Sequence, residues 1–509
     1  MFNYFNRKYI KNIISCFVLR KNLKTKHDIN PHSLCYREIF TENPIESEKI
    51  VFLPPFSNRN GYNMIERFTV ENYRSYQREA ALSFLASNRE KGSTLPPQWY
   101  KEVNGKRLLR LLICVGLNGT GKSKMFSALD YLRMIVIAKP KDPTARPEYR
   151  PFQLDNDSRT KPTVLSLSYY IDTIGYYYKV IVSSERVEEE MLRQTEGNVL
   201  VYQRSYDAEK GLVSVKFGSA CDLSKSDQRM LESSVIQNAT VLSVFGEKNL
   251  NSRVLRDNFN YFANHISLVK RSDQSLADRL KTDDHERDTR VKALLLKLLS
   301  DVGTNIVDYE VDDTSFPITD LIKSGAPDIV VKAMLEQHPT GIISHKNLRF
   351  LHKTVEAGNK SLDVGVESVG TVSIVRLLVV MYDIVMGRKC SCIDEIETGI
   401  HTKALAFILK MYLSIAEDCQ IAVATHDLSL LGYPVLRRDA VRMFEKDDDG
   451  CTYIRKHEYV HNTLNFQKIY CKKVDPKLDE LIGNTDLFLE YRDMVKRFLT
   501  DLAEIKTVK

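Results

Sequence analysis

The sequence lacks the cysteine and hydrophobic patterns that would place it in several large classes of protein. Its nine cysteines are scattered, with no CxxC pair and no Cys/His spacing typical of metal ligands, so neither a disulfide framework nor a zinc site is predicted. The longest apolar stretch, Ser373 to Met386, contains Arg376 and Asp383, so no transmembrane helix is expected. We therefore expect a protein of the reducing cytosol that does not act in a membrane.

Strong charge bias and internal repetition are also missing. The net charge of +7 over 509 residues is compatible with nucleic acid as a partner but does not argue for it. No internal repeat is visible, and no periodic stretch is long enough for an extended coiled-coil arm. The hydrophobic content of 43% and charged content of 27% are typical of globular chains, and the length allows two to four domains.

A glycine-rich loop, GLNGTGKS, is the strongest motif in the sequence. It follows an apolar run, Leu108 to Val115, that predicts a buried strand, and it precedes a predicted helix, Lys124 to Ala138. Strand, glycine turn and helix are the context of a phosphate-binding P-loop, in which the lysine reaches the phosphates and the final hydroxyl binds Mg²⁺. We expect the nucleotide to be held by Gly116, Asn118, Gly119, Thr120, Gly121, Lys122 and Ser123.

Two further apolar segments end in residues suited to hydrolysis. The run from Cys390 to Ile393 ends in Asp394 and Glu395; the first carboxylate can hold Mg²⁺ and the second can orient and deprotonate a water molecule. The run from Ile421 ends in His426, which could donate to the terminal phosphate or hold the water. A carboxylate pair or a lone histidine is often structural, but after a P-loop the catalytic interpretation is favoured.

Two weaker features are candidates for contact with the nucleotide. The stretch Glu367 to Thr371 places Ser368 and Gly370 before a predicted helix, which could form an anion site or a simple helix cap. Arg74 lies in the segment Ile65 to Tyr76, which predicts a first strand followed by a turn. It would approach the nucleotide if that strand neighbours the P-loop strand, and is otherwise a surface arginine.

In their order along the chain, these motifs resemble those of the ABC-type ATPases related to RecF, SMC and Rad50. More narrowly, NYRSY, GLNGTGKS, ESVGT, IDEIETGIH and THDLSLL resemble the prokaryotic AAA-type ATPases of the OLD, RloA and AriA branch, used in anti-phage defence. The resemblance implies an α/β P-loop NTPase of the ABC and SMC-head type with an antiparallel β-layer and a helical insertion. It also implies ATP and Mg²⁺ as cofactors, and a homodimer or higher oligomer in which the Ser368 and Gly370 loop of one subunit caps the nucleotide of the other.

The sequence departs from this family in two respects. The ESVGT segment, Glu367 to Thr371, corresponds to the signature loop of the family but departs from the usual LSGG-type pattern. The apolar residues Val369, Val372 and Val375 stand in and after it, where polar neighbours are usual. The Toprim nuclease domain of OLD proteins has no counterpart, because only about eighty residues follow His426, fewer than a typical domain. An acidic stretch, Glu445 to Gly450, is better interpreted as a hairpin turn than as a nuclease site. A separate effector protein, for example a nuclease, is therefore expected.

The predicted boundaries follow from changes of pattern. Strand-like segments at Asn305 to Asp312 and Gly341 to Val355 are expected to re-enter the nucleotide-binding core. Residues 1–63 could be a flexible basic arm, a partner-binding helix or sequence upstream of a start at Met64, with the first and third favoured. The segments are a basic extension (1–63), an ATPase lobe in two parts (64–222 and 305–460), a helical insertion (223–304) and a helical tail (461–509).

Two functional hypotheses remain open on the sequence alone. The first is an ATPase that acts as a dimeric switch or sensor in anti-phage defence. The alternative is a RecF-like DNA-binding ATPase of repair or recombination, which predicts salt-sensitive DNA binding that stimulates hydrolysis. An ABC transporter subunit fits poorly, because the predicted insertion is large and a membrane partner would be needed.

Overall fold

The computed structural model describes residues 62–87, 99–269, 275–355 and 358–456, except residues 139, 141, 143, 324, 339, 417 and 434–436. These residues divide into two compact units: a large unit of residues 62–269 and 368–456, and a small unit of residues 275–367. Residues 1–61 of the predicted extension (1–63) and the whole of the predicted tail (461–509) lie outside the described residues.

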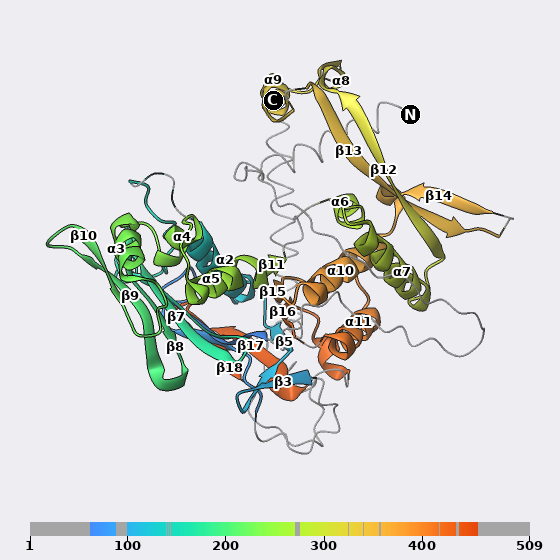
Figure 1. The fold of residues 1–509 in the computed structure, drawn as a ribbon. Coiled ribbons are helices and arrows are strands. Elements are labelled where there is room, and N and C mark those ends of the chain that lie inside the picture. Colours follow the sequence, from blue (N-terminus) through green and yellow to red (C-terminus); the bar gives the residue numbers. More distant parts are fainter. Residues whose placement is uncertain are drawn as a thin grey trace, which may run out of the picture. The chain divides into compact units, whose positions relative to one another are not determined.

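An antiparallel sheet of seven strands forms one layer of the large unit (Figure 1). Its alternating apolar residues bury one face, which is typical of a sheet that packs on a core. Strands β6 and β7 form a hairpin around Asp172 and pair along their whole length. The spatial order is β10 (Leu212–Phe217), β9 (Val199–Asp207), β8 (Val187–Gln194), β7 (Ile174–Val182), β6 (Thr163–Ile171), β1 (Asn63–Glu71) and β2 (Ala80–Ser83).

A second, mostly parallel sheet of six strands carries the P-loop. The P-loop strand β5 lies between β16 and β17, and only β17 and β18 pair antiparallel in this sheet. The order is β11 (Ile266–Val269), β15 (Cys390–Ile393), β16 (Gln420–Thr425), β5 (Leu111–Val115), β17 (Val441–Lys446) and β18 (Thr452–Lys456). The hairpin predicted at the acidic stretch is confirmed, because β17 and β18 are its two arms. A short ribbon of β3 (Tyr100–Val103) and β4 (Lys106–Leu109) precedes β5.

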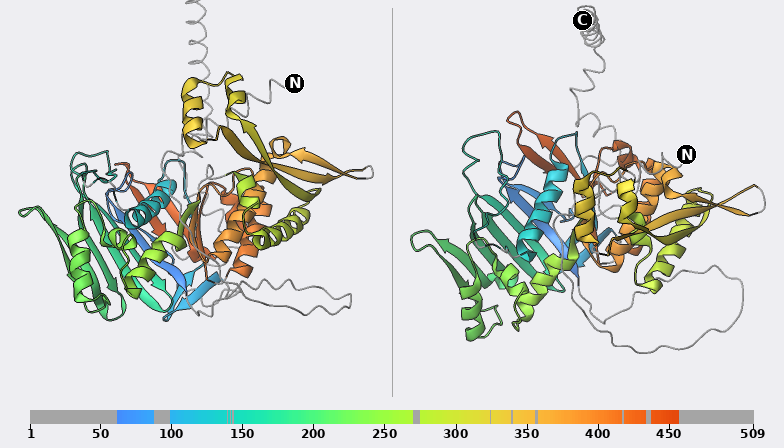
Figure 2. Two further views of the ribbon diagram at one scale, coloured as in Figure 1. Left: turned by 45° about the horizontal axis from the view of Figure 1, so that its top comes forward. Right: turned by 90° about the horizontal axis from the view of Figure 1, so that it is seen from above.

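Helices cover both faces of the parallel sheet (Figures 1 and 2). The P-loop helix α2 (Lys122–Ile137) packs between the two sheets with α4 (Val241–Gly246) and α5 (Arg253–Asn260), and their apolar side chains join one continuous core with both sheets. The helix α3 (Lys225–Ser234) packs on α4 and β10. On the opposite face of the parallel sheet lie α10 (Val369–Met386) and α11 (Thr402–Ile415).

Among the described residues, α10 is the one helix long and apolar enough to cross a bilayer, with a mean hydropathy of 1.9. Half of it is buried inside the protein, including Ile374, Val375 and Leu378. A core helix has the same length and composition, so this feature is weak evidence for a membrane span.

The small unit corrects two of the predictions. The strands expected at 305–312 and 341–355 form, as β12 (Ile306–Pro317) and β13 (Ile342–Lys353), but they pair with each other and with β14 (Asn359–Asp363) in a separate sheet rather than in the nucleotide-binding core. Alternation of apolar residues identifies a strand's buried face but does not identify its neighbour. The helices of the small unit are α6 (Leu276–Leu280), α7 (His285–Asp301), α8 (Ile318–Lys323) and α9 (Asp328–Gln337).

The predicted insertion over 223–304 is also divided differently. Its first part, α3 to α5 and the edge strand β11, belongs to the large unit, and only α6 and α7 belong to the small unit. The reason is that the apolar faces of α4 and α5 complete the core around α2, so these helices are part of the nucleotide-binding lobe.

Candidate active site

The parallel register of β15, β16 and β5 brings three predicted motifs to one edge of the sheet. Val115 pairs with Thr425, and Val423 pairs with Ile393. The residues that follow each strand therefore emerge side by side at the carboxyl edge, where ligands bind in open parallel sheets. Gly116, His426 and Asp394 are these residues, so motifs separated by hundreds of positions in the chain converge.

The backbone of the P-loop is held by close contacts that only glycine permits. A Cβ on Gly121, whose φ is +100°, would lie 2.7 Å from Thr452 Oγ1 and 2.9 Å from Ser75 Oγ. A Cβ on Gly116 would collide with the carbonyl oxygen of Phe444. The hairpin β17–β18 and the turn after β1 thus pack closely against the P-loop backbone. Within the loop, Thr120 Oγ1 donates to Leu117 O at 2.8 Å.

Lys122 lies at the centre of the site. Its buried Nζ donates hydrogen bonds to Gly116 O at 2.6 Å and Leu117 O at 3.0 Å, and lies 3.4 Å from His426 Nδ1. Burial lowers the pKa of the Lys122 ammonium, while the Asp394, Glu397 and Glu395 carboxylates act to raise it. The lysine, the histidine and the acidic strand end therefore form one electrostatic cluster.

The acidic segment after β15 turns sharply. Glu395 adopts a φ of +48°, uncommon for a residue with a side chain. The turn is closed by Thr398, whose backbone N–H and Oγ1 donate to Glu395 O at 3.1 and 2.9 Å. Strained backbone of this kind is frequent at functional sites, and here it leaves Glu395 exposed.

The residues fit a magnesium–nucleotide complex on the chemistry of their donors. Among the described residues, no three His, Cys, Asp or Glu side chains gather to hold a metal alone. Asp394 and the exposed Ser123 instead offer the one or two oxygen ligands with which Mg²⁺ is bound when phosphate oxygens and water complete its shell. Buried Glu397 Oε2 has no hydrogen-bond partner among the described residues, so one carboxylate oxygen at this edge of the sheet is an acceptor without a donor.

Arg74 lies on the flank of the P-loop. It adopts a φ of +52°, its backbone N–H donates to Arg150 O at 2.8 Å, and its guanidinium contacts Tyr73 Oη at 3.2 Å. Burial lowers the pKa of Lys124, and the charges of Lys446 and Arg74 lower it further. Arg74 therefore belongs to a basic group beside the first turn of α2 rather than to the cluster around Lys122.

Ser368 and Gly370 do not reach the P-loop through any hydrogen bond that the described residues make. Ser368 is the N-cap of α10 and accepts from Thr371 N at 3.0 Å. A Cβ on Gly370 would lie 2.7 Å from Gly399 O, so the signature loop packs on the turn that follows β15.

Three supporting residues lie outside the set predicted from the sequence. Glu397 accepts the His426 backbone N–H at 2.7 Å. The hydroxyls of Ser75 and Thr452 meet at 2.9 Å against Gly121. The signal for Glu397 was its position two residues after Glu395, but spacing alone does not show which oxygen or N–H it contacts.

Comparison with known proteins identifies the family. Residues 113–432 match the family described as "AAA domain, putative AbiEii toxin, Type IV TA system". No curated protein matches the sequence. Solved structures with a similar fold include the SMC head domain from Thermotoga maritima, with 12% identity, a TM-score of 0.33, and coverage of 78% of this chain and 99% of that chain.

Another is the Smc head domain with an extended coiled coil, bound to the C-terminal domain of ScpA, from Pyrococcus furiosus, with 11% identity, a TM-score of 0.33, and coverage of 83% and 100%. These low scores carry no weight in the assignment, which rests on the family match and on the observed topology. The predicted α/β P-loop fold with an antiparallel β-layer is confirmed. Because the match spans more than half of the sequence, the chain belongs to this AAA-domain family.

Proposed function

We propose that the protein binds ATP with Mg²⁺ and hydrolyses it. The observation that carries the proposal is the convergence of Lys122, His426 and the acidic turn after β15 at one sheet edge. Catalysis of phosphoryl transfer consists mainly of positioning and charge stabilisation, and a buried ammonium with adjacent carboxylates and a histidine provides both. Mg²⁺, when bound, supplies positive charge to the phosphate oxygens.

Each side chain has a distinct proposed role. Lys122 and the N–H groups of the P-loop hold the phosphates, while Ser123 and Asp394 would hold the metal. Glu395, at the strained and exposed position, orients and deprotonates the attacking water. His426 lies beside Lys122 and is suited to donate to the terminal phosphate or to hold that water.

The active assembly is proposed to be a homodimer or higher oligomer that closes on ATP. The support is that Ser368 is exposed and Val369 is 63% exposed, and that the hydrogen bonds of the Ser368 hydroxyl among the described residues go to Thr371 of its own loop. A second subunit could therefore receive this loop over its nucleotide. Exposed apolar Val369 would favour such an association.

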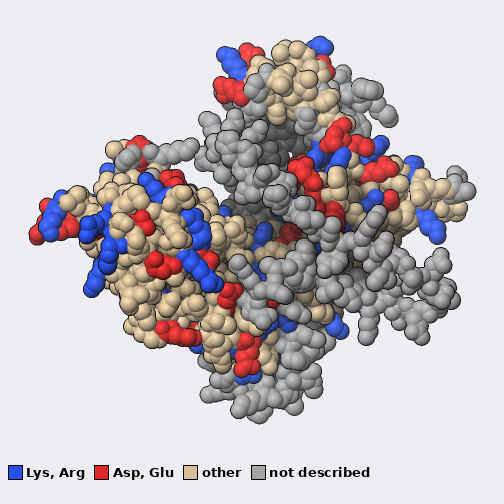
Figure 3. Space-filling view, viewed as in Figure 1, with Lys and Arg blue, Asp and Glu red and all other residues tan. Residues whose placement is uncertain are grey.

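In the cell we propose a cytoplasmic switch or sensor in anti-phage defence, acting through a separate effector protein such as a nuclease. The resemblance to the OLD, RloA and AriA branch supports this role, as does the toxin in the description of the matched family. On the face in Figure 3, basic and acidic side chains are interspersed over the described surface, which does not favour the RecF-like alternative of a DNA-binding ATPase.

The experiment compares ATP binding and hydrolysis in the wild type, Lys122→Ala and Glu395→Gln. Lys122→Ala should abolish nucleotide binding, whereas Glu395→Gln should bind ATP, fail to hydrolyse it and accumulate as the larger assembly in light scattering. Equal residual turnover in both variants would refute the roles. Pull-down with the ATP-bound Glu395→Gln variant reports the effector, and salt-sensitive stimulation of turnover by DNA would favour the RecF-like alternative.

A further inference from the structure

Glu397 links the acidic turn after β15 to the histidine after β16. Its Oε1 accepts the backbone N–H of His426 at 2.7 Å. His426 directly follows β16, and its imidazole Nδ1 lies 3.4 Å from Lys122 Nζ. One carboxylate oxygen therefore fixes the main chain of the residue whose side chain reaches the P-loop lysine.

The turn that contains Glu397 does not depend on this carboxylate. Backbone bonds close it: Thr398 N donates to Glu395 O at 3.1 Å, and Ile400 N donates to Glu397 O at 2.8 Å. Among the described residues, the side-chain hydrogen bond of Glu397 goes to His426. A role confined to local turn geometry therefore does not explain why a carboxylate stands here.

The second oxygen of Glu397 is buried and unpaired. Oε2 has no hydrogen-bond partner among the described residues, and burial of an unpaired carboxylate oxygen is unfavourable unless a nearby positive charge compensates it. Lys122 is such a charge, because the Glu397 carboxylate acts to raise the pKa of its ammonium. The same side chain thus contacts the histidine through one oxygen and balances the lysine through its charge.

We propose that Glu397 is a positioning residue for ATP hydrolysis, which holds His426 at the strand end so that its imidazole and the Lys122 ammonium face the same phosphate. This inference rests on the proposed ATPase function. It distinguishes Glu397 from Glu395, whose proposed contact is with water. It also predicts that Glu397 and His426 act as one unit. The decreases in kcat caused by removing each side chain should therefore not multiply in the double variant.

The test measures kcat, KM and ATP affinity of the full-length protein. Glu397→Ala and His426→Ala should each lower kcat by about 10- to 100-fold, as small misplacements of reacting groups do, with ATP affinity within about threefold of the wild type. The double variant should be no slower than the slower single variant, because coupled residues are non-additive. Glu397→Gln, which keeps an acceptor oxygen for the His426 N–H, should recover most of kcat, whereas the shorter Glu397→Asp should not.

The matched control is Glu188→Ala, which removes a partly buried carboxylate that hydrogen-bonds Ser183 Oγ at 2.6 Å in the same unit. It should keep the wild-type kcat.

The inference is overturned if Glu397→Ala turns over like the wild type, if the two alanine effects multiply, or if Glu397→Gln is as slow as Glu397→Ala. If Glu397→Ala does not fold, the comparison of kcat between Glu397→Gln and Glu397→Asp tests the inference. A wild type without turnover would refute the ATPase function itself, before any Glu397 variant is compared.

Discussion

The hydroxyl of Tyr76 donates a hydrogen bond of 2.8 Å to the carbonyl oxygen of Gly121. This bond joins the turn after β1 to the N-cap of α2, where the same oxygen also accepts the N–H groups of Lys124 and Met125 at 3.0 Å. Burial raises the pKa of Tyr76 well above its usual value, so the phenol remains a donor at any working pH. The P-loop is therefore anchored by the turn that follows β1 of the antiparallel layer.

Tyr76→Phe removes this bond while keeping the ring in the core. We expect the free energy of unfolding to fall by about 1 kcal/mol, the net contribution of a typical hydrogen bond, and ATP to bind several-fold more weakly because the loop loses an anchor. Urea unfolding and nucleotide titration measure the two effects. Unchanged ATP affinity in a variant with the expected stability loss would show that the anchor does not affect the loop.

Gly121→Ala tests the close packing of the P-loop against the β17–β18 hairpin. The new Cβ would approach Thr452 Oγ1 and Ser75 Oγ within 3 Å at a φ of +100°, so loop and hairpin must separate. We expect loss of nucleotide binding and a clear drop in melting temperature.

The matched control for this variant is Gly105→Ala in the β3–β4 turn, where φ is +73° but nothing lies within 4 Å of the added carbon. Its free energy of unfolding should fall by about 1–2 kcal/mol, the cost of placing a residue with a Cβ at positive φ. Its ATP binding should remain intact. If the two variants lose equal stability and bind ATP equally, contact with the hairpin does not shape the loop.

The site was predictable because its parts are local patterns with strong chemistry. A glycine loop between an apolar strand and a helix, and apolar strands that end in Asp394 or His426, each indicate a position at the carboxyl edge of a parallel sheet. The sequence also predicts that these edges coincide, since parallel strands share one direction. The contact of Lys122 with His426 agrees with that expectation.

Other features depend on partners that are remote in the chain, and patterns do not specify them. The alternation in β12 and β13 predicts strands but not that they pair only with each other and β14. The packing of α4 on α2 and of α5 on α4 is set by shape across the core, so the pattern does not place the boundary of the insertion. The sequence does not identify the contact of Glu397, because only the register of β15 on β16 brings it to the His426 N–H.

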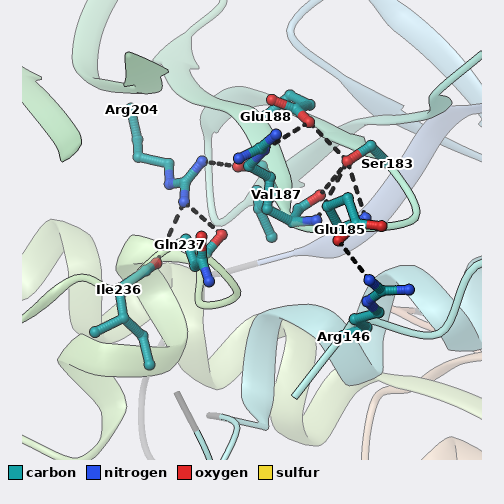
Figure 4. A network of polar contacts seen from close by, with 9 residues as sticks. Arg146, Ser183, Glu185, Val187, Glu188, Arg204, Ile236 and Gln237 are labelled. Atoms are coloured by element: carbon teal, nitrogen blue, oxygen red, sulfur yellow. Dashed lines mark hydrogen bonds and ion pairs between the residues drawn. The ribbon is translucent and has the colours of Figure 1, made fainter. Parts of the chain in front are cut away.

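Arg204 is a buried cation that should contribute strongly to the stability of the large unit (Figure 4). Its guanidinium donates to the carbonyl oxygens of Val187, Ile236 and Gln237, and so ties β8 and β9 to the segment before α4. Its charge also lowers the pKa of the buried Glu190 carboxyl, which burial raises overall.

Arg204→Ala should lower the free energy of unfolding by about 3–5 kcal/mol, because one partner of a buried charged network is removed and the others stay buried. Arg193→Ala on the same sheet is the matched control, since its guanidinium lies over the Tyr177 ring at 4.6 Å and should contribute about 1 kcal/mol or less. Denaturant unfolding of both variants measures the difference. A loss below about 1 kcal/mol for Arg204→Ala would contradict the structural role.

His265 gives the large unit a pH dependence of defined sign. The ring lies between the Asn63 amide at 3.2 Å from Nε2 and the Arg388 carbonyl oxygen at 3.2 Å from Nδ1, contacts that a neutral imidazole satisfies with one acceptor and one donor nitrogen. Burial lowers the pKa of His265; the Arg388 and Gly387 carbonyl oxygens act to raise it, and the nearby Lys389 and Arg388 charges to lower it. The folded chain therefore takes up this proton less readily than the unfolded chain.

The stability that follows is present above the unfolded pKa of about 6.5 and is lost as pH falls through that value toward the folded pKa. We expect the stability difference between the wild type and His265→Gln to shrink between pH 7.5 and pH 5.5, measured by urea unfolding at each pH. His285→Gln, a variant of an exposed histidine, is the matched control. A constant difference for His265→Gln across this range would contradict the prediction, because it would mean that the imidazole gains its proton equally in both states.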